Sequence, residues 1–328
     1  MADAKNAFAQ FFEKIQNVFK QPTPQTAQPV AFGEAGLNMK SIIGKLRRYE
    51  IRIRKAVNTS MQGDARSVFK GSGLEFDDVR QYQYGDDVRT VNWNVSAKGH
   101  GVYVNTYKEE KEQNIFIILD VSESQQVGHK GKQKLDTGKE LAGVLTLSAI
   151  REASSVGILA FSDQKEAYVR PDKGSKQASQ IIKVLYRLVP DSKKTDLTKA
   201  IQQAMRLIKR KSVIILISDF IDQNYETALK GMSQKHDLIC LHLSDQREQR
   251  FPALGIVPIL DKETGKKTWV NTNSDAFRKK FMNQFAQKQE ELEKICHQYQ
   301  ADYVGIEAGE DFVPKLVKLF KVRKTKRK

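Results

Sequence analysis

The sequence has few cysteines. Only two occur among its 328 residues, Cys240 and Cys296, which are too few and too far apart in the chain for a disulfide framework or a cysteine-based metal cluster. Cys240 lies inside the apolar run 238–243, which predicts a reduced thiol in a protein core. Reduced thiols are typical of the cytoplasm, where we expect this protein to act.

Long apolar runs are also missing. No segment approaches the roughly 20 apolar residues that a membrane-spanning helix needs. The first residues lack the pattern of a signal peptide, in which basic residues precede an apolar stretch. The sequence therefore predicts a protein without a membrane span, in the cytoplasm or peripheral to the inner membrane.

Basic residues are abundant. Lys and Arg number 55 against 39 Asp and Glu, which gives a formal net charge of +16. This charge attracts anionic surfaces without naming one, so nucleic acid, an anionic membrane face and an acidic protein all stay open. Residues 321–328 are mostly Lys and Arg, and we expect a disordered basic tail that attracts an anionic surface and adds little to stability.

The remaining pattern alternates between apolar strands and amphipathic helices. Short β-branched runs such as 115–119, 156–161 and 213–217 predict strands that are buried on both faces. Helical spacing of apolar residues separates these runs, for example over 135–152. Strands that alternate with helices predict an α/β fold with a doubly wound, mostly parallel sheet.

The strand and loop from Asn114 to Ser124 organise the rest of the chain. The apolar run ends at Asp120, at the carboxyl end of the strand, where open α/β folds bind their ligands. Asp120, Ser122 and Ser124 place three hard oxygens at every second position of one loop. Such oxygens suit Mg²⁺. Taken alone, however, an Asp and two Ser after a strand usually serve only the loop backbone, and this interpretation is favoured for the loop by itself.

Two further residues extend this set. Asp219 follows the buried strand 213–217, and Thr195 precedes the helix that leads into it. Because parallel strands end at the same edge of a sheet, we expect these oxygens to meet the loop after Asp120. The ordered set resembles the metal-ion-dependent adhesion site of von Willebrand factor A domains. That resemblance implies a Mg²⁺ ion, or another divalent cation, held by Asp120, Ser122, Ser124, Thr195 and Asp219, with a carboxylate supplied by a partner.

The stretch 71–103 contains the densest group of unusual residues. It has no glycine loop that matches a phosphate cradle and no pair with the spacing of a nucleophile and its base. Its acidic and basic residues interleave, which predicts an irregular segment held by Asp–Arg pairs and by a buried Trp93. The residues that define this signature segment are Glu75, Phe76, Asp78, Arg80, Tyr82, Gly85, Asp86, Asp87, Arg89 and Trp93.

The signature segment is similar to that of a bacterial family catalogued as domain of unknown function fifty-eight. Members resemble von Willebrand factor A domains and are typically encoded beside MoxR-type AAA+ ATPases, which implies such an ATPase and a client protein as partners. The chain departs from the family pattern at Asn92, where Asp is usual, and at Lys98, where Arg is usual. Lys193 and Lys194 replace small residues before the threonine, which implies either narrower access to the metal site or a lower affinity for the metal.

These patterns predict four parts. Residues 1–36 form an amphipathic helix and a linker, 37–112 a helical and irregular part with the signature, 113–320 the von Willebrand factor A-like domain, and 321–328 the basic tail. The resemblance implies a non-catalytic, Mg²⁺-dependent interaction module that assembles or remodels protein complexes with a MoxR-type ATPase.

Two alternatives stay open: a metal-dependent phosphohydrolase with Asp120 as nucleophile, and a basic nucleic-acid-binding protein. Ser122 weakens the first, because haloacid-dehalogenase-like sites need a second Asp there, and the second has no recognition motif.

Overall fold

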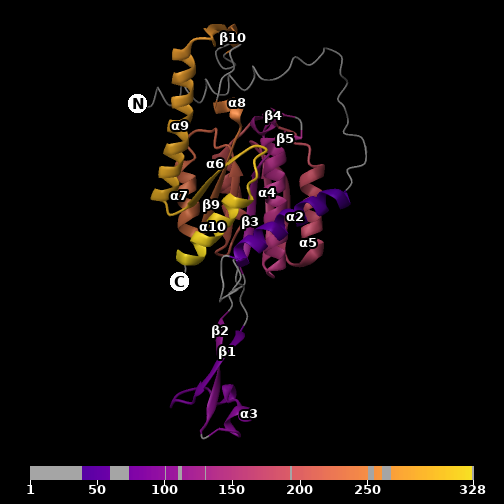
Figure 1. Ribbon diagram of the computed structural model, residues 1–328, viewed down its shortest axis with the longest axis vertical. Coiled ribbons are helices and arrows are strands. Elements are labelled where there is room, and N and C mark those ends of the chain that lie inside the picture. The colour runs from indigo at the N-terminus through magenta and orange to yellow at the C-terminus, as the bar shows by residue number, and fades with distance from the viewer. Residues whose placement is uncertain are drawn as a thin grey trace.

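A six-stranded sheet forms the centre of the molecule (Figure 1). The computed structural model describes residues 39–59, 74–99, 101–109, 113–129, 131–192, 194–249, 255–260 and 267–326. The sheet has the order β12-β9-β8-β3-β6-β7, and only the β6–β7 pair is antiparallel. Its strands are β3 (Asn114–Asp120), β6 (Ser155–Phe161), β7 (Lys165–Asp172), β8 (Val213–Ser218), β9 (Asp237–Ser244) and β12 (Asp302–Glu307). The predicted doubly wound, mostly parallel sheet is thereby confirmed.

Strand β3 lies at the centre because its side chains are apolar on both faces. Ile115 to Leu119 are all at most 1% exposed, as a strand covered by helices on both sides requires. The chain runs outward from β3 in one direction through β6 and β7, and in the other through β8, β9 and β12. The carboxyl end of β3 is therefore the point where the strand order reverses, which is where such sheets bind ligands.

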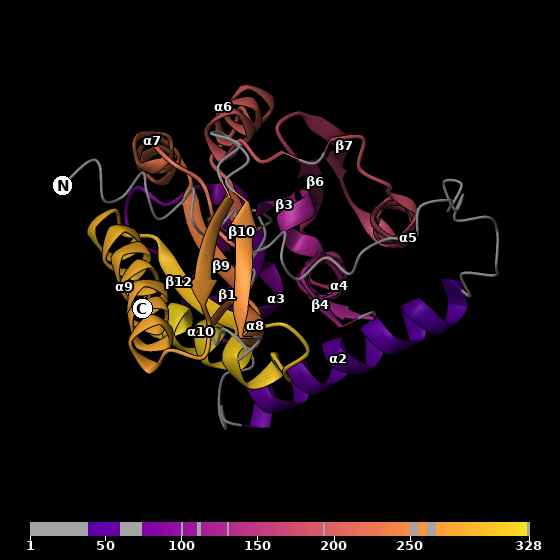
Figure 2. The same ribbon diagram turned by 90° about the horizontal axis from the view of Figure 1, so that it is seen from above.

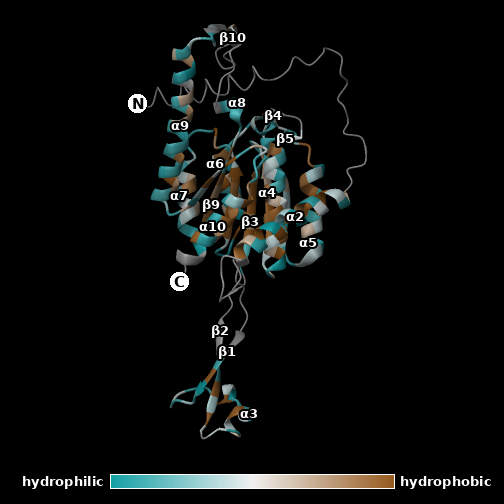
Figure 3. Cartoon of the chain, in the orientation of Figure 1, coloured by the Kyte–Doolittle hydropathy of each residue, from teal (hydrophilic) through white to brown (hydrophobic). Residues whose placement is uncertain are grey.

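Helices cover both faces of the sheet (Figure 2). One face packs against α2 (Met39–Thr59), α4 (Lys134–Arg151), α5 (Gly174–Arg187) and α10 (Val313–Lys326). The other packs against α6 (Leu197–Leu207), α7 (Glu226–Lys235) and α9 (Asp275–Gln298). Colouring by hydropathy shows apolar strands between helices whose outer faces are polar (Figure 3). The core thus consists of two apolar layers separated by the sheet.

Helix α2 joins the body although it precedes the signature segment in sequence. Leu46 is fully buried and packs over Gly143 of α4, where a β-carbon would lie 2.7 Å from the Leu46 side chain. The basic face of α2 pairs with the body, because Lys45 bonds Glu140 of α4 and Arg52 lies 2.5 Å from Asp311. A glycine at position 143 lets the two helices approach closely.

The signature segment folds as a hairpin, which the sequence did not predict. Strands β1 (Leu74–Gln81) and β2 (Tyr103–Glu109) pair antiparallel, and the 3₁₀ helix η1 (Val88–Thr90) and α3 (Trp93–Ser96) lie between them in the chain. This hairpin lies away from the six-stranded sheet, beyond the amino end of β3 (Figure 1).

Local polar contacts hold the connection between β1 and β2. Arg80 contacts Asp86 at 2.6 Å, which is the predicted kind of Asp–Arg pair. Asp87 caps η1, and Gly85 takes a φ of +104°, a value that favours glycine. The prediction of a buried Trp93 is wrong: the residue is 68% exposed, at the start of the four-residue helix α3.

The chain end also differs from prediction. Helix α10 continues to Lys326, so most of the expected tail is helical. Arg323 is the reason, because its guanidinium pairs with both Asp237 and Asp302, at the starts of β9 and β12. The side chain of Arg323 is only 10% exposed. The prediction of a disordered tail is therefore wrong for residues 321–326.

Short elements surround the carboxyl ends of the strands. They are η2 (Glu123–Gln126), β4 (Gly128–His129), β5 (Lys132–Gln133), α8 (Gln246–Gln249) and the hairpin of β10 (Ile256–Leu260) with β11 (Lys267–Asn271). The predicted amphipathic helix and linker, residues 1–36, lie outside the described residues. None of the helices that the structure describes has both the length and the apolar character that crossing a membrane requires.

Candidate metal centre

Four of the five predicted metal ligands meet at the carboxyl edge of the sheet. Asp120 ends β3, Ser122 and Ser124 follow it, and Asp219 follows β8, the neighbour of β3. The hydroxyl oxygens of Ser122 and Ser124 lie 3.0 Å apart, and Ser124 also hydrogen-bonds to Asp219. The structure therefore brings together oxygens that are 99 positions apart in the sequence at their extremes, Asp120 and Asp219.

Asp120 is the residue of this site whose negative charge is least compensated by its surroundings. Its Oδ1 accepts the backbone N–H of Ser122 at 3.0 Å, and its Oδ2 accepts from Ser218 at 2.7 Å and from Gln125 at 3.3 Å. The side chain is 1% exposed and forms no ion pair with any described residue. Burial, and then the charge of Asp219, raise the pKa of Asp120 to about 7. A cation beside Asp120 would relieve this repulsion.

Thr195 lies at the same edge but forms no hydrogen bond with the other four residues in the part of the chain that the structure describes. It stands in the loop before α6, next to Asp196, whose side chain caps that helix. The backbone N–H of Asp196 bonds to the carbonyl of Ser162, just past the end of β6. Lys194 is exposed, and Lys193 lies outside the described residues, so the suggested narrowing of access stays a prediction.

A buried lysine occupies the edge of this site, and the sequence analysis did not identify it. Lys134 is the first residue of α4 and has no exposed surface. Its Nζ lies 2.7 Å from Oδ2 of Asp219 and also bonds Glu248 of α8. Burial opposes the charge on Asp219, but the Lys134 ammonium outweighs it and lowers the pKa of Asp219. The same two carboxylates raise the pKa of Lys134 despite its burial.

Gln125 carries an unsatisfied atom at the site. The residue is fully buried, and its Nε2 donates to Asp120 and, at 3.4 Å, to Ser124. Its Oε1 has no hydrogen-bond partner. Buried polar atoms nearly always have a partner, so an orphaned oxygen points to an absent ligand or water. Gln125 and Ser218 are thus additional members of the site, and their only sequence signal is their position beside Asp120 and Asp219.

The chemistry of the donor set fits a small divalent cation. Among the described residues, no group of three or more His, Cys, Asp and Glu side chains is placed to hold a metal ion. The site instead offers two carboxylates and the hydroxyls of neighbouring serines, which are the hard oxygens that Mg²⁺ prefers. The unpaired charge of Asp120 and the orphaned oxygen of Gln125 favour the same conclusion.

The family follows from a comparison with known proteins. A family model described as "Protein of unknown function DUF58" matches residues 78–291, which is more than half of the chain. The chain belongs to this family. The resemblance seen in the signature segment is thereby confirmed, because the match begins within β1 and continues through the sheet into α9.

Relatives of this DUF58 chain occur in mycobacteria. The uncharacterized protein Mb1516 of Mycobacterium bovis is 23% identical over 245 residues, which cover 74% of this chain and 77% of that protein. The uncharacterized protein MAV169 of Mycobacterium avium is 25% identical over 130 residues, which cover 39% of this chain and 76% of that protein. These names assign no activity.

Several solved structures overlap with this DUF58 chain. The conserved hypothetical protein BatB from Bacteroides thetaiotaomicron covers 65% of this chain and 99% of its own, with 14% identity and a TM-score of 0.43. An aerotolerance-related membrane protein from Bacteroides fragilis gives 17% identity over the same shares and a TM-score of 0.44. Proximal thread matrix protein 1 from the mussel byssus, with a zinc-occupied MIDAS motif, covers 65% of this chain and 47% of its own, with 16% identity and a TM-score of 0.38. The strand order itself shows a doubly wound, mostly parallel sheet with one antiparallel edge strand, β7.

Proposed function

We propose that this protein is a non-catalytic interaction module that binds a partner's carboxylate through a divalent cation, with Mg²⁺ as the expected ion. The observation that supports this proposal best is Asp120, a buried carboxylate at the ligand-binding edge of the sheet that no described cation pairs with. A buried carboxylate without a cation beside it is unfavourable, and a positively charged ligand bound next to Asp120 would offset this cost.

The proposed cation is held by the predicted set. Ser122, Ser124 and Thr195 offer hydroxyl oxygens, while Asp120 and Asp219 act in direct contact or through water. The bound ion would supply a positive charge, and an Asp or Glu of the partner would complete its coordination. The five side chains include only two carboxylates, and one of these, Asp219, also pairs with Lys134, so the ion would still attract that partner's carboxylate.

A catalytic alternative has less support. Ser122 stands where a haloacid-dehalogenase-like phosphohydrolase needs a second Asp, and both carboxylate oxygens of Asp120 already accept hydrogen bonds. Asp120 is also 1% exposed, which leaves little room for an in-line attack on a phosphoester. A nucleic-acid-binding role would rest on the net charge of +16 alone.

The proposed partners follow from the family resemblance. A MoxR-type AAA+ ATPase would act with this module, and a client protein would be assembled or remodelled. Either of these proteins can supply the acidic side chain that completes the metal coordination.

The test is association measured with purified components. A purified MoxR-type ATPase is passed over the immobilised protein in Mg²⁺ or in EDTA, and wild type, Asp120→Ala and Ser122→Ala are compared. The proposal expects binding by wild type in Mg²⁺ only. Equal retention in all conditions would overturn the adhesion-site mechanism, and retention of DNA that weakens with salt would instead favour the nucleic-acid alternative.

A further inference from the structure

The buried lysine beside the candidate metal centre is the feature that the proposed function leaves unexplained. A fully buried ammonium needs carboxylates around it, because isolated charges are very unfavourable in a protein interior. Lys134 has two such carboxylates, from two different elements: Asp219 follows β8, and Glu248 belongs to α8. One of them, Asp219, is also a proposed metal ligand.

We propose that Lys134 is a tethered cation that competes with the divalent ion for Asp219, and that Glu248 retains Lys134 when the ion binds. This inference rests on the proposed function, since it needs a divalent ion at the site. In the metal-free protein, Lys134 shares its charge between Asp219 and Glu248. With a bound ion, Asp219 would be shared with the ion, and Glu248 would remain the carboxylate that pairs with Lys134.

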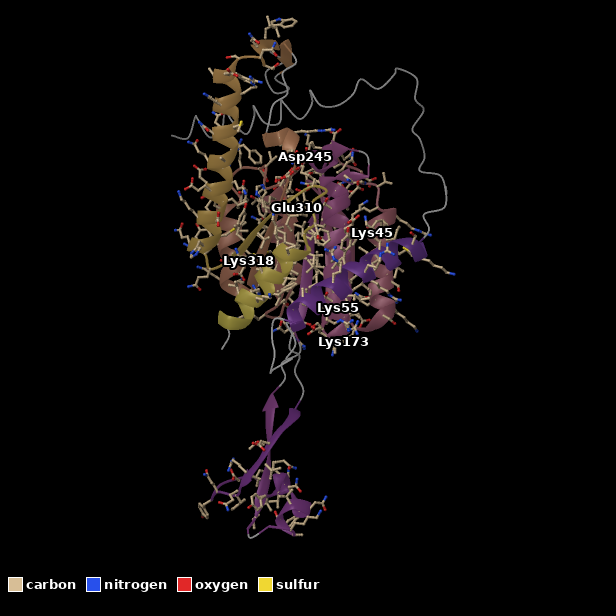
Figure 4. All side chains as sticks on the ribbon, viewed as in Figure 1. Lys45, Lys55, Lys173, Asp245, Glu310 and Lys318 are labelled. Carbon is tan, nitrogen blue, oxygen red and sulfur yellow. The ribbon has the colours of Figure 1, made fainter. Side chains whose placement is uncertain are left out.

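Glu248 is placed to serve as the second partner. Its Oε1 bonds Lys134, and its Oε2 accepts the backbone N–H of Asp245 at 3.2 Å, so the carboxylate is fixed at the start of its own helix. Asp245 lies at the carboxyl end of the sheet, at the opposite end of the body from Lys173 (Figure 4). Helix α8 follows β9 directly, so the lysine links the metal edge to an element that is not itself a ligand.

The competition has a definite consequence for affinity. With Asp120, Asp219 and Glu248 ionised and Lys134 charged, the four side chains carry a net charge of about −2. Replacing both Lys134 and Glu248 by neutral residues leaves the same net charge on Asp120 and Asp219. A change in affinity in that double variant therefore reports the direct contact between Lys134 and Asp219 and not the overall field.

The experiment measures Mg²⁺ binding to the full chain by titration calorimetry, with thermal melting in Mg²⁺ and in EDTA as a second readout. The variants are Lys134→Met, Glu248→Gln and the double variant, and Asp120→Ala reports the site itself. Lys45→Met is the matched control, because Lys45 pairs with Glu140 on the surface of the body and touches no proposed ligand.

Lys134→Met and Glu248→Gln should change the affinity for Mg²⁺ in opposite directions. Lys134→Met should bind Mg²⁺ about tenfold more tightly than wild type, which corresponds to about 1.4 kcal/mol. Glu248→Gln should bind it about tenfold more weakly, because Lys134 then has only Asp219. The double variant should again bind more tightly than wild type, and Lys45→Met should match wild type.

The outcomes separate this inference from the proposed function. If Asp120→Ala abolishes Mg²⁺ binding while the double variant binds as wild type does, the site is real and the competition by Lys134 is refuted. If wild type and every variant fail to bind a divalent ion, the proposed function fails and the inference fails with it. Should Lys134→Met alone not fold, because it leaves two buried carboxylates without the ammonium, the double variant still decides the question.

Discussion

Asp120 carries a charge that its surroundings do not neutralise, so substituting this residue tests whether the site binds a cation. Ser218, Gln125 and the backbone of Ser122 donate to its carboxylate, yet its pKa rises to about 7 because burial and Asp219 oppose ionisation. Groups placed for binding often lower the stability of the free protein in this way.

Asp120→Asn should stabilise the metal-free protein at pH 8, by roughly 1–3 kcal/mol. The new amide keeps the shape of the side chain, and the orphaned Oε1 of Gln125 can accept its N–H once the Gln125 amide rotates. The measurement is urea unfolding in EDTA. Added Mg²⁺ should then stabilise wild type but not the variant, and a less stable variant in EDTA would contradict the account.

His242 gives the protein an acid-sensitive core. Burial, opposed in part by Asp219, lowers the pKa of His242 to about 4, and its Nδ1 lies 2.8 Å from the hydroxyl of Tyr303. Between pH 6.5 and 4 the unfolded chain binds a proton that the native histidine does not. Stability should therefore fall on acidification through this window, by up to about 3 kcal/mol from this residue.

In the Asp120→Asn background, His242→Gln should flatten the dependence of unfolding free energy on pH between 6.5 and 4.5, because this background removes the raised pKa of Asp120, which acts with the opposite sign in the same window. His297→Gln, at an exposed position on α9, is the control and should leave the slope of that background. Some slope should remain in both variants, because burial and Lys235 also lower the pKa of His236. An unchanged slope in His242→Gln would show that this histidine is protonated in the native state.

The sequence predicted the positions of those residues that follow the ends of buried strands, while their role as metal ligands stays a prediction. Asp120 and Asp219 each end an apolar run, so their meeting follows from the parallel order of β3 and β8. Lys134 and Glu248 were not predictable, because they are 114 positions apart and neither has a local pattern that indicates an ion pair. Burial of charge is a property of the assembled layers and not of any short stretch.

At the scale of elements, the contact between α2 and α4 depends on one glycine. Gly143 faces the Leu46 side chain, where a β-carbon would lie 2.7 Å from it, whereas Gly44 of α2 has nothing within 4 Å of its own β-carbon position. Gly143→Ala should lower stability by about 1–3 kcal/mol through overpacking. Gly44→Ala should raise it by about 0.5–1 kcal/mol through helix propensity. Equal effects of the two substitutions in chemical denaturation would contradict this packing.

The hairpin of β1 and β2 allows a second comparison between elements. Trp93 is 68% exposed, so Trp93→Ala should change stability by about 0.5 kcal/mol or less. Val104 of β2 is 2% exposed, and Val104→Ala should destabilise the hairpin by about 1–2 kcal/mol. Hydrogen exchange of the hairpin amides measures both, and a large loss of protection in Trp93→Ala would show that the indole packs.

The hairpin was hard to predict because the alternation of apolar and polar residues at the start of β1 breaks after Phe76. Its backbone pairing shifts register between Phe76 and Asp78, and its connection contains η1 and α3 in place of a short turn. The sequence pattern instead suggested an irregular segment held by ion pairs. Only the Arg80–Asp86 pair of that description is present among the described residues.

At the scale of the whole molecule, the two unusual regions lie at opposite ends. The candidate metal centre is at the carboxyl ends of the strands, and the hairpin that carries the family signature is beyond their amino ends (Figure 1). The order of the helices and strands was predictable because buried strands and amphipathic helices have distinct periods. The position of the hairpin was not, because it depends on no apolar face that the sequence displays.

The C-terminal helix α10 packs against the sheet at the end of the molecule that bears the hairpin. Arg323 of α10 reaches Asp237 and Asp302, at the amino ends of β9 and β12, and so ties the last helix to two strands of the sheet. The side chain of Arg323 is only 10% exposed, which makes its ion pairs stronger than those of an exposed residue.

Truncation of residues 321–328 should therefore lower the unfolding free energy by about 2 kcal/mol, which is several degrees in melting temperature. A shorter truncation, of residues 325–328, removes three basic side chains but keeps Arg323 and should have little effect. Arg323→Met in the full chain isolates the ion pairs from the length of the helix and should reproduce most of the loss. Calorimetric melting of the three variants at low and high salt measures the effect. If the longer truncation melts as wild type does, the end of α10 adds nothing to the fold and its basic residues act only as an electrostatic tail.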